Sequence, residues 1–222
     1  MFLNLRKSIK KILQQNILDE RKDILHVLVD YIDEKYSKGQ RVSLNFICTH
    51  NSRRSQFTQI WAHTAAAYYN LKVSCYSGGI EVTAFDQRAV ASIIRSGFEV
   101  HTEGDYNPIH YISYEKDVKS RLKCFSKLYA DPVNKSDSFA AIMTCSSADR
   151  KCPLIKGAER RISIQYEDPK VFDDTPDEIN KYDENRNELG AYDQNITSDT
   201  LSSSHHLLGF SILKPPLSMS SE

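Results

Sequence analysis

The sequence has no excess of either charge and no long apolar segment. Its 222 residues include 29 lysines and arginines against 29 aspartates and glutamates, so the formal net charge is zero. Phosphate contacts need a surplus of cationic side chains, so this balance argues against a nucleic-acid partner. No apolar run approaches the roughly 18 residues of a membrane-spanning helix, and the N-terminus has no signal-like apolar core. We therefore expect no membrane association.

The sequence does contain enough hydrophobic residues for a folded core, and an odd number of thiols. Hydrophobic residues make up 40% of the chain and aromatic residues 10%, which argues against wholesale disorder. Cysteines without a secretion signal indicate a reducing compartment, where closely spaced thiols are more often reactive than structural. We therefore expect a cytoplasmic protein with reactive cysteines among its five, which are Cys48, Cys75, Cys124, Cys145 and Cys152.

Predicted strands and helices alternate along the middle of the chain. Short apolar, β-prone runs predict buried strands over 42–49, 72–77, 139–144 and 161–166. Helical periodicity follows the first two of these runs. Such alternation predicts a three-layer α/β/α fold, with a central parallel sheet of about four strands between two layers of helices.

Segments outside this alternation divide the chain further. Amphipathic periodicity near the N-terminus predicts a helical extension over 1–40, so the main domain is expected over 41–189. Residues 103–137 are long and mixed in composition, and we interpret them as an insertion that runs mainly over the surface. Residues 190–222 are rich in serine, aspartate and asparagine and are predicted to form a disordered tail.

The residues with the clearest chemistry form one segment, Cys48-Thr49-His50-Asn51-Ser52-Arg53-Arg54-Ser55, between a predicted strand and a predicted helix. A strand that stops directly before a helix leaves the first helical amides unpaired, and the helix dipole adds positive potential. Successive amides around such a point form a cradle for a tetrahedral oxyanion. We call residues 48–55 the oxyanion loop.

Side chains of this loop suit nucleophilic attack on a bound oxyanion. Arg54 can clamp two oxygens of the anion bidentately. Cys48 lies at the base, where the same field favours a thiolate nucleophile. Ser55 can donate a hydrogen bond to that thiolate, and Asn51 is placed to hold the loop. Thr49, His50, Ser52 and Arg53 complete the expected support of the oxyanion and the thiolate.

Simpler interpretations of the loop exist. A Cys-x5-Arg spacing also occurs by chance, as a buried cysteine at a strand end with a surface arginine nearby. Its position at a strand-to-helix junction favours the functional interpretation. Arg53 either adds positive charge for a dianion or is a solvated residue of the first helical turn.

The loop resembles that of the low-molecular-weight protein tyrosine phosphatases and of the arsenate reductases that share their fold. Both families have a Cys-x5-Arg-Ser loop after their first strand. A second matching feature is Tyr166-Glu167-Asp168-Pro169, and the resemblance implies that Asp168 is the general acid that protonates the leaving oxygen. Without the family, Asp168 is a turn residue before a proline.

A third feature resembles the thioredoxin-coupled arsenate reductases most closely. Cys145 and Cys152 lie seven residues apart, and a proline follows them. The resemblance implies a relay in which Cys48 attacks arsenate, Cys145 attacks Cys48, and Cys152 attacks Cys145. Thioredoxin would then reduce the final disulfide. A metal site is the competing interpretation, but two thiols alone do not complete a zinc shell and no Cys-x2-Cys is present. Two inert core thiols are the other alternative.

The sequence therefore predicts an arsenate reductase with no bound metal or cofactor and with thioredoxin as its reductant. The first alternative is a phosphatase that hydrolyses a phosphomonoester or a phosphoprotein through a Cys48 phosphoenzyme. The second is a non-catalytic phosphate-binding module. Two departures from the family pattern stand out. His50 replaces the usual glycine, where a positive φ would strain it, and Asp168-Pro169 lacks the paired tyrosines that would support a phosphotyrosine groove.

Overall fold

A computed structural model of the protein describes residues 1–135, 137–152 and 154–191. Its centre is a four-stranded sheet in the order β2-β1-β6-β7, and each neighbouring pair of strands is parallel. Because both faces are covered, the inner strands are apolar almost throughout. The parallel sheet of about four strands expected from the sequence is confirmed. Its strands are β1 (Val42–Cys48), β2 (Val73–Gly79), β6 (Phe139–Met143) and β7 (Ala158–Ser163).

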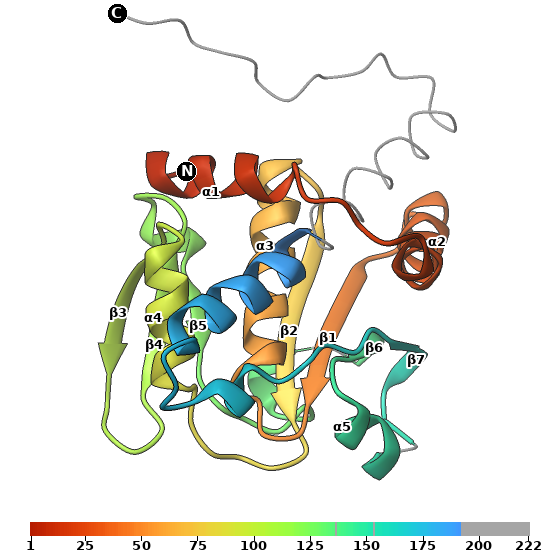
Figure 1. Cartoon of the computed structure of the whole chain (residues 1–222). Coiled ribbons are helices and arrows are strands. Elements are labelled where there is room, and N and C mark those ends of the chain that lie inside the picture. Colours follow the sequence, from red (N-terminus) through yellow and green to blue (C-terminus); the bar gives the residue numbers. More distant parts are fainter. Residues whose placement is uncertain (136, 153, 192–222) are drawn as a thin grey trace, which may run out of the picture.

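Helices cover both faces of this sheet (Figure 1). On one face α3 (Arg54–Tyr68) packs on β1 and β2, whereas α2 (Asp19–Ser37) and α5 (Ser146–Lys151) pack on the other face. A further helix over 178–191 approaches α3 so closely that a Cβ on Gly190 would lie 3.1 Å from the ring of Trp61. The fold is therefore the predicted three-layer α/β/α arrangement.

The N-terminal helices share the core of the sheet. Leu5 and Ile9 of α1 (Leu3–Ile12) and Leu28 of α2 belong to the same buried cluster as Phe46 of β1. Residues 1–40 are thus helical, as expected, and α2 forms part of one layer of the fold. The proposed boundary near residue 40 stays a prediction about domain organisation.

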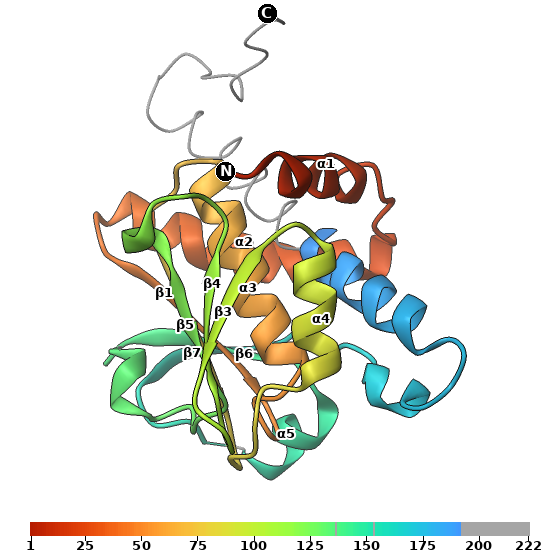
Figure 2. The same cartoon turned by 90° about the vertical axis from the view of Figure 1, so that its left-hand side faces the viewer.

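A second sheet lies beside the first and is antiparallel (Figure 2). It follows α4 (Gln87–Arg95) and consists of β3 (Glu99–Glu103), β4 (Ile109–Ser113) and β5 (Leu122–Cys124). The sequence does not reveal β3, because nearly all of its side chains are exposed and polar and produce no apolar run. Most of this sheet falls within 103–137, and its Ile112, Leu122 and Cys124 belong to the same buried cluster as the parallel sheet.

Three short 3₁₀ helices and two shifted boundaries complete the description. β7 begins three residues before the predicted strand. The apolar pattern missed these residues because most of them are exposed at the sheet edge. The predicted tail begins at 190, but residues 190 and 191 are helical. Residues 192–222, which make up the rest of the predicted tail, lie outside the described residues. No helix in the described part of the chain combines the length and apolarity needed to span a bilayer. The 3₁₀ helices are η1 (Val118–Ser120), η2 (Pro132–Asn134) and η3 (Pro169–Phe172).

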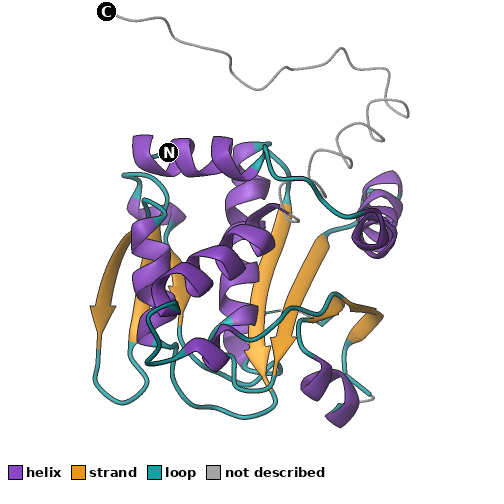
Figure 3. Cartoon of the chain, in the orientation of Figure 1, coloured by secondary structure: helices purple, strands orange, loops and turns teal. Residues whose placement is uncertain are grey.

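The loops that follow β1, β2 and β6 meet at the carboxyl edge of the parallel sheet, which is the lower edge in Figure 3. Open α/β sheets bind their ligands at this edge. The oxyanion loop, the start of α4 and α5 all lie there (Figures 1 and 3).

Candidate active site

The oxyanion loop begins where β1 ends, and its backbone encloses the sulfur of Cys48. This side chain is 4% exposed. Its sulfur accepts a hydrogen bond from the backbone N–H of Asn51 at 3.1 Å and lies 3.0 Å from the hydroxyl oxygen of Ser55. Both groups therefore lie within hydrogen-bonding distance of the sulfur. The predicted partnership of Cys48 and Ser55 is present in the structure.

Asn51 holds the loop through its side chain as well as its backbone. Its φ of 48° lies in the left-handed region, which asparagine tolerates better than most residues. Its side-chain amide donates to Ser55 at 2.9 Å and to Ser77 of β2 at 3.0 Å. Its side-chain carbonyl oxygen accepts a hydrogen bond from the backbone N–H of Lys127 at 3.1 Å. The positive φ of the loop thus falls on Asn51, and His50, where strain was considered, is spared.

Gly79, the last residue of β2, allows the loop to lie directly against the sheet. A Cβ at this position would lie 2.8 Å from the carbonyl oxygen of Thr49 and 2.9 Å from the nitrogen of Asn51. The next two amides, of Ile80 and Glu81, donate to that Thr49 oxygen at 2.8 and 2.9 Å. These bonds fix the first half of the loop.

Residues 126–129 of the proposed insertion contact the loop and Gly79. We call this segment the brace. The hydroxyl of Ser126 donates to the carbonyl oxygen of His50 at 2.7 Å. Gly79 donates to the carbonyl oxygen of Lys127 at 2.8 Å, and Tyr129 donates back to Gly79 at 3.0 Å. Part of the proposed insertion thus packs against the oxyanion loop. Sequence reasoning missed these residues, and no local pattern marks them.

Two adjacent arginines bind the same carboxylate at the mouth of the loop. Arg54 donates to Asp168 at 2.6 Å and to the carbonyl oxygen of Tyr166 at 3.1 Å. Arg53 donates to the other oxygen of Asp168 at 3.0 Å and to Asp86 at 2.9 Å. The side chain of Arg53 is only 11% exposed. Arg53 is therefore not a solvated residue of the first helical turn.

Asp86 belongs to this group and was not predicted. It caps α4, because its side chain accepts from the amides of Arg88 and Ala89. Its own amide donates to the carbonyl oxygen of Ser52 at 3.0 Å, so the start of α4 is joined to the loop. An aspartate before an amphipathic helix looks like an ordinary cap in sequence, which is why this second contact escaped notice.

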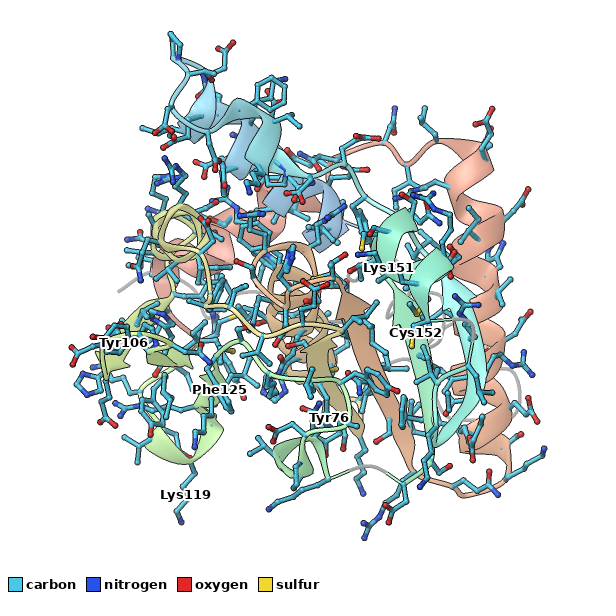
Figure 4. All side chains as sticks on the ribbon, turned by 90° about the horizontal axis from the view of Figure 1, so that it is seen from below. Tyr76, Tyr106, Lys119, Phe125, Lys151 and Cys152 are labelled. Carbon is cyan, nitrogen blue, oxygen red and sulfur yellow. The ribbon has the colours of Figure 1, made fainter. Side chains whose placement is uncertain are left out.

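The second pair of thiols lies next to the loop. Cys145 caps α5, its sulfur accepting from the amide of Ala148 at 3.3 Å, and it lies 3.5 Å from the hydroxyl oxygen of Thr49. Cys48 and Cys145 belong to one buried cluster, and the partly exposed Cys152 packs against that cluster. Figure 4, seen from below, shows Cys152 next to Lys151 at the end of α5.

The remaining thiols lie elsewhere, in β2 and β5. Cys75 and Cys124 are buried in the larger core, away from the cluster that contains Cys48. Burial raises the pKa of Cys124 to about 12, the nearby Lys127 opposing the shift. All five cysteines are free thiols in the structure. Among the described residues, no group of three or more histidines, cysteines or acidic side chains is arranged to hold a metal ion.

His50 is on the outer side of the loop. Its imidazole is 45% exposed and lies 3.2 Å from Glu81, whose other oxygen is 3.8 Å from the ammonium of Lys151. Glu81 thus contacts both His50 of the oxyanion loop and Lys151 of α5. Because these side chains are about half exposed, the contacts add little stability.

The sheet, the Cys-x5-Arg loop after its first strand and the paired thiols at its carboxyl edge together define an α/β protein with a candidate cysteine-based site. No family model matches the chain. It is 24% identical over 131 residues to arsenate reductase 2 of Staphylococcus epidermidis, a match covering 57% of this chain and 78% of the relative. An arsenate reductase from a second strain of that species matches equally.

Solved structures of both kinds of enzyme are also similar. A low-molecular-weight protein tyrosine phosphatase from T. tengcongensis has a TM-score of 0.49 and 15% identity, covering 73% of this chain and 99% of that one. For a thioredoxin-dependent arsenate reductase from Corynebacterium glutamicum the TM-score is 0.43 and the identity 16%, covering 90% and 85%. The resemblance to arsenate reductases that the motifs indicate is thus also found in the sequence comparison.

Proposed function

We propose that the protein is an arsenate reductase that uses Cys48, Cys145 and Cys152 in sequence. The observation that carries the proposal is the grouping of these three thiols in and against one buried cluster beside the oxyanion loop. A phosphatase has no use for the second and third thiols. The curated relatives named arsenate reductase add support.

In the first step, the Cys48 thiolate attacks the arsenic of an arsenate held by the loop amides and Arg54. A sulfur–arsenic bond forms and one oxygen departs as water, with Asp168 supplying a proton. The oxidation state of arsenic does not change here. The N–H of Asn51 and the hydroxyl of Ser55 stabilise Cys48 as thiolate before attack.

In the second step, the thiolate of Cys145 attacks the sulfur of Cys48. A disulfide forms, the sulfur–arsenic bond breaks, and its electron pair stays on arsenic, which leaves as arsenite. Two thiolates have then supplied the two electrons. Cys152 next attacks Cys145, which releases the Cys48 thiolate and moves the disulfide to the more exposed pair. We propose thioredoxin as the dithiol that reduces it, and the cytoplasm as the compartment.

A phosphatase is the second candidate. It needs only Cys48, Arg54 and Asp168, and the contact of Arg54 with Asp168 keeps a carboxylate at the mouth of the loop. Hydrolysis would proceed through phosphorylated Cys48, with water as the second nucleophile.

Paired assays separate the candidates. Thioredoxin-dependent arsenate reduction and aryl-phosphate hydrolysis are measured for the unmodified protein and for Cys48→Ser and Cys145→Ser, with Cys75→Ser as the control from the larger core. We expect arsenate turnover to be lost in the first two variants and kept in the control. Arsenate turnover that survives in Cys145→Ser contradicts the relay. Phosphate release without arsenate turnover favours the phosphatase, and phosphate binding without either activity favours a non-catalytic module.

A further inference from the structure

Asp168 binds two arginines at the mouth of the oxyanion loop, and one of them also binds a second carboxyl group. Arg54 and Arg53 each bind one of its oxygens, and Arg53 continues to Asp86. Burial disfavours the charge on Arg53, but the carboxylates of Asp168 and Asp86 outweigh this and raise the pKa of its guanidinium. Arg53 thus lies between two carboxyl groups and binds both.

We expect Arg53 and Arg54 to behave differently when an oxyanion binds. Arg54 is the residue that we take to bind the anion, through a bidentate contact of its guanidinium. In the structure its two terminal nitrogens contact Asp168 and Tyr166. If both terminal nitrogens turn to the anion, one of the two cations that hold Asp168 is withdrawn.

Arg53 differs from Arg54 because its second partner is itself held in place. Asp86 is held by two amides of α4 and by its own amide bond to the loop. We therefore expect Arg53 to keep its 3.0 Å contact with Asp168 when Arg54 turns to an anion.

We propose that Arg53 is a positioning residue that retains Asp168, and the turn containing it, at the mouth of the loop while Arg54 binds the oxyanion. This inference rests on the proposed function only in taking the loop as an oxyanion site. It assigns a role to Arg53 and Asp86, and it separates that role from anion binding. Before binding, either arginine can hold the turn; after binding, only Arg53 can.

The test measures amide hydrogen exchange of a peptide covering 166–173, with and without inorganic phosphate. The backbone amide of Lys170 donates to Asp168, so release of the carboxylate is reported there. The unmodified protein should stay protected in both conditions. Arg53→Ala should stay protected alone and exchange at least tenfold faster with saturating phosphate. Arg53→Lys, which keeps the charge but cannot bridge two carboxylates, should be intermediate and serves if the alanine variant does not fold.

Matched controls locate the effect. Asp86→Asn keeps the helix cap but removes the charge, and should show a smaller increase of the same kind. Arg95→Ala removes an arginine that binds Asp183 and does not contact Asp168, and should behave like the unmodified protein. Phosphate affinity should fall at least 100-fold in Arg54→Ala and by a smaller factor in Arg53→Ala.

The outcomes distinguish this proposal from the proposed function. Equal protection of the turn in Arg53→Ala with phosphate overturns the positioning role, and so does a loss of phosphate affinity in that variant as large as the loss in Arg54→Ala. The expected exchange pattern without arsenate turnover supports Arg53 and contradicts the reductase. If the unmodified protein does not bind phosphate, both are wrong.

Discussion

The sulfur of Cys145 lies 3.5 Å from the hydroxyl oxygen of Thr49, the residue that directly follows Cys48. The second thiol of the proposed relay is therefore already beside the oxyanion loop. Cys152 is at the opposite end of α5, and seven residues of helix rise by about 10 Å. The α-carbons of a disulfide lie only about 5.5–6 Å apart, so the two ends of α5 cannot be joined while it is helical.

We therefore expect α5 to unwind when the disulfide between Cys145 and Cys152 forms. Hydrogen exchange of residues 146–151 should be protected in the reduced protein and fast after oxidation. Cys152→Ser should keep the protection under the same oxidant, and Cys75→Ser should behave like the unmodified protein. A mapped disulfide between Cys145 and Cys152 with α5 still protected would show that the helix accommodates the bond.

Replacement of Asn51 by alanine should destabilise the protein by about 3–5 kcal/mol, because buried hydrogen bonds and a tolerated left-handed backbone are lost together. Asn70→Ala is the matched control. Asn70 also has a positive φ, of 56°, but is exposed and lies beyond the end of α3. Its replacement should cost only the backbone strain, about 1–2 kcal/mol. Urea unfolding measures both values. Equal values would mean that the side chain of Asn51 contributes nothing.

Gly79→Ala should weaken phosphate binding by tenfold or more, because the new methyl group displaces the backbone of Thr49 and Asn51. Gly104→Ala separates crowding from backbone strain. Gly104 has a φ of +90°, but its nearest neighbour is 3.9 Å from the Cβ position. This control should lose stability without losing affinity. Titration calorimetry with inorganic phosphate tests both variants, and unchanged affinity in Gly79→Ala would contradict the close fit.

Acid should destabilise the fold through two histidines. His110 is fully buried, and its Nε2 has no hydrogen-bond partner among the described residues; burial lowers its pKa below 6.5. Burial likewise lowers the pKa of His63. The unfolded chain then binds protons that the folded chain does not. The stability that these histidines provide is fully present above pH 6.5 and is lost as the pH falls through their folded pKa values.

Each histidine should add a slope of up to about 1.4 kcal/mol per pH unit below pH 6.5. Urea unfolding between pH 5 and pH 8 measures this dependence. His110→Asn and His63→Asn should each flatten it, and the double variant should flatten it further. The same slope in every variant would assign the acid sensitivity to other groups.

The sheet and the loop were predictable because each is a local pattern. β1 is a mainly apolar, β-prone run, and the Cys-x5-Arg spacing begins at its last residue. The spacing says which residues are close along the chain, but not which backbone angle each adopts. For that reason the positive φ could be considered for His50 when the structure has it at Asn51.

The supporting residues were not predictable because they reach the loop from distant segments. Ser77 follows Asn51 by 26 positions, and Lys127 follows it by 76. Asp86 contacts Arg53 across 33 positions. Each of these residues satisfies a local rule as a strand, loop or cap residue, so its second contact leaves no trace in the neighbouring sequence. The role of the brace follows only from the tertiary structure.

The brace also determines when during synthesis the loop can acquire its form. A growing chain that ends before residue 126 already contains every residue of the Cys-x5-Arg motif, together with β1, α3 and β2. It does not yet contain the hydroxyl that binds the His50 carbonyl or the backbone that pairs with Gly79. A ribosome must therefore add more than 70 residues after Cys48 before the oxyanion loop can make all of its contacts. Until then, the loop lacks the hydrogen bonds that the brace provides.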